Sequence, residues 1–173
     1  MKNLNFKVLL LGLAFAGVAQ AADSRPVSIG PDATISFETG GAMLTPSSRT
    51  KLKELVAQAR TKGKIDEIQV AVWSDNPVPR VGEQLSQSDR KLAEKRGNAI
   101  RKYLKTPLQI ADVDSYNMAE RASWLARVFD TNEAELKAEI GRGGNGQMSR
   151  EEFQVFRDKG KPSNAVALVI MKH

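Results

Sequence analysis

The chain has 173 residues, no cysteine and a formal net charge of +6 from 26 basic and 20 acidic side chains. This length suits one domain, and the lack of cysteine excludes disulfides, lipid attachment through cysteine and thiol catalysis. The single histidine is the terminal His173, and basic and aromatic residues do not cluster, which argues against histidine-dependent catalysis and against nucleic acid as a partner.

Residues 1–21 have the layout of a secretory signal peptide. Lys2 and Lys7 form a basic start, residues 8–18 are apolar, and residues 19–21 form a small-residue cleavage site. The apolar stretch is shorter than the about 20 residues that a membrane-spanning helix needs, which disfavours a membrane anchor. We therefore expect cleavage after Ala21, export to the periplasm as a soluble protein of the cell envelope, and no membrane span in the mature chain. Its formal charge is then +4 (24 basic minus 20 acidic).

The first part of the mature chain predicts strands alternating with helices. Residues 33–41 alternate apolar and polar side chains, as a half-buried strand does. A helix should follow, capped by Ser47 or Ser48 and ended by Gly63. Its apolar positions recur at helical spacing: Leu52, Leu55, Val56 and Ala59. Residues 65–75 predict a second strand, residues 76–88 a loop, and residues 89–105 a second helix.

The second part adds a third strand at 111–118 and helices at 119–130, 131–140 and 149–160, the last with a Ser149–Glu152 capping box. Residues 164–172 are apolar on both faces and predict a central strand. We therefore expect residues 22–173 to form one α/β domain, an α+β sandwich. Its mixed sheet would have βαβαβ-type order, helices on one face, and a helical insertion at about 111–162 before the last strand.

Arg96 occupies an unusual position in the predicted second helix. Successive helical residues turn by about 100°, which places Arg96 within the apolar stripe that contains Leu92 and Ile100. A buried guanidinium needs acceptors, and Asp75, at the end of the preceding strand, is the expected partner. The pair could bind a zwitterion, with Asp75 taking the ammonium and Arg96 the carboxylate. The alternatives are a purely structural ion pair and an arginine that extends to water.

Four segments resemble the OmpA-like, peptidoglycan-binding domain family. "FETGGAMLTP" resembles the entry to the family's first helix, and "VAVWSD" lies where the family has a strand ending in G-H-T-D. "DRKLAEKRGNAIRKYL" is similar to the family helix N-x-x-L-S-x-x-R-A-x-x-V-x-x-Y-L. "NAVALVI" lies at the position of the closing N-R-R-V strand. The resemblance covers roughly residues 33–107 and 164–171 and implies the OmpA-like fold.

In that family, the strand-end aspartate and the helix arginine bind the diaminopimelate of the peptidoglycan stem peptide. The resemblance therefore implies peptidoglycan as the partner of an outer-membrane-associated binding domain, with Asp75 and Arg96 as ligands. Asp89 and Asn164 would contribute at the rim. The chain departs from the family motif at Trp73, where the family has histidine, and lacks both arginines of N-R-R-V.

A second hypothesis is a diverged OmpA-like domain that has lost cell-wall binding and contacts envelope proteins through the insertion at 111–162. A hydrolase is disfavoured because no nucleophile, metal cluster or poised acid pair stands out, so we expect no enzyme activity and no cofactor. Residues 141–153 superficially resemble a calcium-binding loop, but Gly141 and Gly143 lack the required side-chain oxygens. We expect no metal there.

Overall fold

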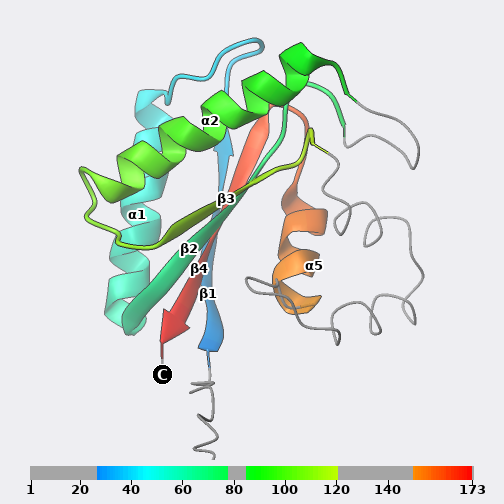
Figure 1. Cartoon of the computed structure of the whole chain (residues 1–173). Coiled ribbons are helices and arrows are strands. Elements are labelled where there is room, and N and C mark those ends of the chain that lie inside the picture. The colour runs from blue at the N-terminus through cyan, green and yellow to red at the C-terminus, as the bar shows by residue number, and fades with distance from the viewer. Residues whose placement is uncertain (1–26, 78–84, 121–149, 173) are drawn as a thin grey trace, which may run out of the picture.

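The computed structural model describes residues 27–77, 85–120 and 150–172 (Figure 1). Four strands form one sheet: β1 (Val27–Ser36), β2 (Lys64–Val72), β3 (Val113–Asn117) and β4 (Asn164–Lys172). Three helices are described: α1 (Pro46–Lys62), α2 (Gln87–Lys105) and α5 (Arg150–Lys159). The predicted α+β class, the third strand and the two helices after the first two strands are confirmed.

The sheet is mixed and has the strand order β1-β4-β2-β3. β4 pairs antiparallel with both β1 and β2, while β3 pairs parallel with β2. The last strand is therefore central, as its continuous apolar sequence predicted, and all its residues from Ala165 to Met171 are buried. The parallel β2–β3 pair is connected through α2, the usual way to join parallel neighbours.

Side chains of β4 alternate between two cores, one on each face of the sheet. Ala167 and Val169 pack in a cluster with α1 and α2, and Leu168 and Ile170 pack in a cluster with Phe156 of α5. The sequence predicted helices on one face of the sheet, and α1 and α2 together cover one face. α5, which belongs to the predicted insertion, covers the opposite face, so the described sheet lies between two helical layers (Figure 1).

Two boundaries in the first third of the chain differ from prediction. β1 begins at Val27 and ends at Ser36, with an irregularity between Ile29 and Asp32, so it starts earlier than the strand expected at 33–41 and gives way to a loop after Ser36. The cap of α1 is Thr45, whose Oγ1 accepts a hydrogen bond from the Ser48 amide, so capping by Ser47 or Ser48 was wrong. The reason is proline at position 46, which favours the first helical position and makes the preceding residue the cap.

Several predicted features lie outside the described residues. They are the signal peptide at 1–21, the helix at 131–140, most of the helix at 119–130, Ser149 of the capping box, and most of the calcium-loop-like segment at 141–153. Within residues 27–77, 85–120 and 150–172, no helix is both long and apolar enough to cross a bilayer.

Candidate functional site

Arg96 is completely buried and is held by four hydrogen bonds. Nε donates to the Gly41 carbonyl at 2.7 Å, Nη1 to the Trp73 carbonyl at 3.0 Å, and Nη2 to the Glu38 carbonyl at 3.0 Å. The guanidinium also lies 5.1 Å from the centre of the Phe37 ring. The apolar stripe of α2 correctly predicted a buried arginine, and main-chain carbonyls meet most of its need for acceptors.

Asp75 completes the set of acceptors, as predicted. Its Oδ1 accepts from Arg96 Nη2 at 2.7 Å and from the Ser163 hydroxyl at 2.7 Å, and its Oδ2 accepts from the Gly40 amide at 2.6 Å. The Asp75 side chain is 20% exposed, whereas that of Arg96 is 0% exposed. The carboxylate of the pair is therefore accessible from the surface, whereas the guanidinium is not.

Electrostatics keep Asp75 ionised. Its partial burial alone would raise the pKa of the carboxyl group, but the hydrogen bonds from Ser163, Gly40 and Arg96, with the positive charge of Arg96, lower the pKa below its ordinary value. A carboxylate fixed by three donors and exposed on one side is suited to accept a hydrogen bond from a cation at neutral pH.

Acid should weaken this ion pair. Because the folded state lowers the pKa of Asp75, its contribution to stability is complete above the unfolded value of about 3.9 and is lost as the pH falls through the folded value. We expect the difference in unfolding free energy between wild type and Asp75→Asn to be larger at pH 6 than at pH 3. Urea unfolding at both pH values measures it, and an equal difference at the two values contradicts this account.

Asp89 lies in the first turn of α2 and is linked to the Asp75 segment. Its Oδ1 accepts from Asn76 Nδ2 at 2.9 Å, and its amide donates to the hydroxyl of the cap residue Ser86. The hydrogen bond from the Ser86 hydroxyl is the largest influence on its pKa, which lies below the ordinary value. Asp89 is thus a second ionised carboxylate next to the predicted site, and it also stabilises the helix start.

Asn164 is less directly placed than its neighbour Ser163. Asn164 starts β4, and its carbonyl accepts from the Trp73 amide at 3.0 Å. Ser163 instead reaches Asp75 with its hydroxyl and joins the end of β2 through its amide, which donates to the Ser74 carbonyl at 2.7 Å. Its φ of 61° is unusual for a residue other than glycine and turns the chain into the site.

Sequence reasoning missed Ser163, Gly40 and the three carbonyl acceptors. Gly40 has a φ of 70°, a conformation that glycine adopts freely, and this turn points its amide at Asp75. The adjacent glycines in "TGG" are the signal that could have indicated a close approach of the main chain. Trp73 lies in the core that contains α5 and contributes only its carbonyl to Arg96.

No family model matches the sequence, and no curated protein matches it. In structure, the chain is similar to the OmpA-like domain of FopA1 from Francisella tularensis subsp. tularensis SCHU S4, at 15% identity and a TM-score of 0.42 over 90% of this chain and 86% of that one. It is also similar to a MotB-like protein from Desulfovibrio vulgaris, at 13% identity and a TM-score of 0.39 over 85% of this chain and 82% of that one.

Proposed function

We propose that this protein is a non-enzymatic domain of the periplasm that binds peptidoglycan through the diaminopimelate of its stem peptide. The observation that carries the proposal is the Asp75 carboxylate, which is ionised, held by three donors and 20% exposed at the end of β2. This is one of the two positions that the OmpA-like resemblance assigns to diaminopimelate binding, and its charge suits the ammonium group. An ammonium group donating to Asp75 would form a charge-assisted hydrogen bond.

Arg96 acts in this proposal by positioning Asp75 and the loop at residues 38–41. Since its side chain has no exposed surface and donates to Glu38 and Gly41, a direct contact with ligand would require that loop to move. The ligand carboxylate that Arg96 was predicted to bind must therefore find other donors. Asp89, joined to the same segment through Asn76, adds negative potential for an approaching ammonium group.

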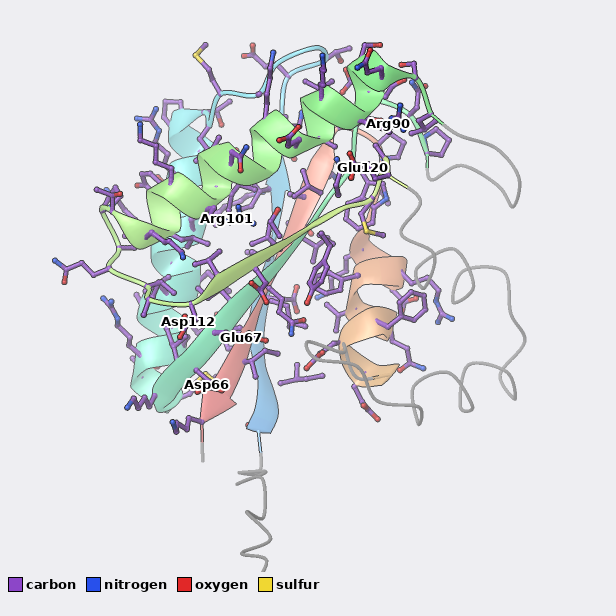
Figure 2. All side chains as sticks on the ribbon, in the orientation of Figure 1. Asp66, Glu67, Arg90, Arg101, Asp112 and Glu120 are labelled. Atoms are coloured by element: carbon purple, nitrogen blue, oxygen red, sulfur yellow. The ribbon has the colours of Figure 1, made fainter. Side chains whose placement is uncertain are left out.

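Sedimentation with insoluble peptidoglycan sacculi tests the proposal. We expect wild type to co-sediment and Asp75→Asn to bind about tenfold more weakly, because a hydrogen bond to a charged group is lost. Asp112→Asn is the matched control, since Asp112 is exposed and lies well away from Arg90, which is in the first turns of α2 (Figure 2). Circular dichroism checks that all three proteins are folded.

Two results of this experiment reject the proposal. The first is that wild type stays in the supernatant. The second is that Asp75→Asn sediments as well as Asp112→Asn does. Release of soluble fragments from sacculi by wild type would reject the absence of enzyme activity. Fractionation of producing cells, with the protein recovered in the cytoplasmic rather than the periplasmic fraction, would reject the proposed location.

The second candidate is a diverged domain that no longer binds the cell wall and contacts envelope proteins. The full burial of Arg96 favours it, because a closed Asp75–Arg96 pair is what a purely structural bridge would look like. This candidate expects no co-sedimentation of wild type, together with a loss of stability in Asp75→Asn that is not seen in Asp112→Asn.

A further inference from the structure

A groove lies between the loop that leads into α1 and the C-terminal half of α2. Its volume is ≈ 460 Å³, and nine residues line it: Ala42, Met43, Leu44, Arg49, Ala99, Lys102, Tyr103, Thr106 and Pro107. Most of these side chains are apolar, and Met43 is 85% exposed. A concave apolar surface of this size with a few polar groups is typical of a site for a small ligand or short peptide.

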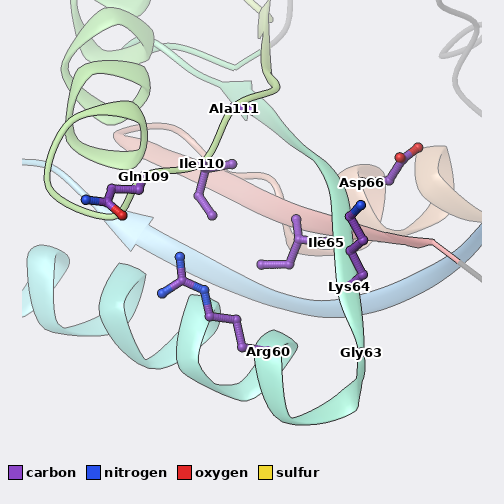
Figure 3. A pocket seen from close by; sticks show the side chains of 8 residues that line it. All are labelled: Arg60, Gly63, Lys64, Ile65, Asp66, Gln109, Ile110 and Ala111. Carbon is purple, nitrogen blue, oxygen red and sulfur yellow. The ribbon is translucent and has the colours of Figure 1, made fainter.

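The charged groups of the groove have one sign. Arg49 and Lys102 are both exposed, and none of the nine lining residues is acidic. The groove is therefore complementary to a ligand that combines small apolar groups with carboxylates. The hollow shown in Figure 3 differs from the groove in its charges. It has Asp66 beside Lys64, and its Arg60 already donates to the Leu108 carbonyl at 2.8 Å.

One loop contributes to both the Asp75 site and the groove. Gly40 binds Asp75 and Gly41 binds Arg96, and the next residues of the same loop, beginning at Ala42, line the groove. Along α2, Tyr103 follows Arg96 by seven residues, a rise of about 10 Å at 1.5 Å per residue. An extended peptide covers about 3.3–3.6 Å per residue, so about three residues span the same distance.

We infer that the groove binds the remainder of the wall stem peptide whose diaminopimelate occupies the Asp75 site; this rests on the proposed function. The stem peptide alternates alanine methyl groups with free carboxylates, which matches an apolar floor flanked by two cations. Arg49 and Lys102 then pair with the free carboxylates of the stem-peptide residues other than the diaminopimelate. Tyr103 and Met43 provide the apolar contact surface.

Calorimetric titration with two probes tests the inference, using free diaminopimelate and the wall tetrapeptide of L-alanine, D-glutamate, diaminopimelate and D-alanine. We expect wild type to bind the tetrapeptide about tenfold more tightly than free diaminopimelate, because the tetrapeptide adds two exposed ion pairs and some apolar contact. Arg49→Gln combined with Lys102→Gln should reduce this advantage to about twofold and leave the affinity for free diaminopimelate unchanged. The advantage in wild type should also shrink as salt is raised.

The matched control is Lys53→Gln combined with Lys105→Gln, which removes the same charge from exposed positions of α1 and α2 outside the groove. It should keep the tenfold advantage. If the groove variant keeps it as well, or if both double variants lose it equally, the groove inference is wrong while the proposed function stands. If wild type binds neither probe, the proposed function itself is wrong.

Discussion

Replacing Arg96 by alanine should lower the free energy of unfolding by about 3–5 kcal/mol. The change removes a fully buried side chain and leaves the carbonyls of Glu38, Gly41 and Trp73 without their donor. It also leaves Asp75 without its counter-ion. Removing one partner of a buried charge pair is strongly destabilising for this reason. Urea unfolding followed by circular dichroism measures the loss.

Lys95→Ala is the control for this prediction, because Lys95 is the exposed neighbour of Arg96 on the same helix. Its effect should stay within about 0.5 kcal/mol. Arg96→Lys should fall between the two, since an ammonium keeps the charge and cannot reproduce the planar arrangement of guanidinium donors. A loss below about 1 kcal/mol for Arg96→Ala would mean that the loop at residues 38–41 is not fastened by this side chain.

The second large effect is expected at Gly160, which follows α5. A Cβ atom there would overlap the indole ring of Trp73 and lie 2.6 Å from the Phe156 carbonyl oxygen. Trp73 is only 4% exposed, so its ring has little room to move. We expect Gly160→Ala to cost about 3 kcal/mol of unfolding free energy, at the upper end for an overpacked core.

Gly97→Ala is the matched control for Gly160→Ala. Its added Cβ would meet mainly the hydroxyl of Ser115, which can rotate away, so the loss should be below about 1 kcal/mol. Trp73→Leu should restore part of the stability when combined with Gly160→Ala, because it removes the ring that the methyl group overlaps. If the two substitutions are additive, the close packing of α5 against Trp73 is not the cause.

The sequence predicted those parts of the fold whose burial leaves a periodic trace. β4 is apolar at consecutive positions because the sheet has a helical layer on both faces, and this pattern identified it as central. The stripe of α2 identified Arg96 as buried because one residue of the wrong polarity interrupts a helical repeat. Asp75 followed as its partner from the adjacency of strand and helix.

The rest of the site is made by contacts that leave no such trace. The Gly41 carbonyl that binds Arg96 is 55 residues away in sequence, and the Ser163 hydroxyl is 88 residues from Asp75. Carbonyl acceptors have no residue-type signature, since every residue carries one. Whether a ligand can reach the Asp75–Arg96 pair depends on how the loop at residues 38–41 lies over α2. No local sequence pattern indicates that arrangement.

The central place of β4 also has a consequence for when the domain can fold. β1 pairs only with β4, and β2 needs β4 to join it to β1, so the described sheet has no connected form before residues 164–172 are available. Contacts between strands this distant in sequence form late and slowly. During synthesis from the N-terminus, β4 is made after the other three described strands. The described sheet should therefore stay incomplete until residues 164–172 have been made.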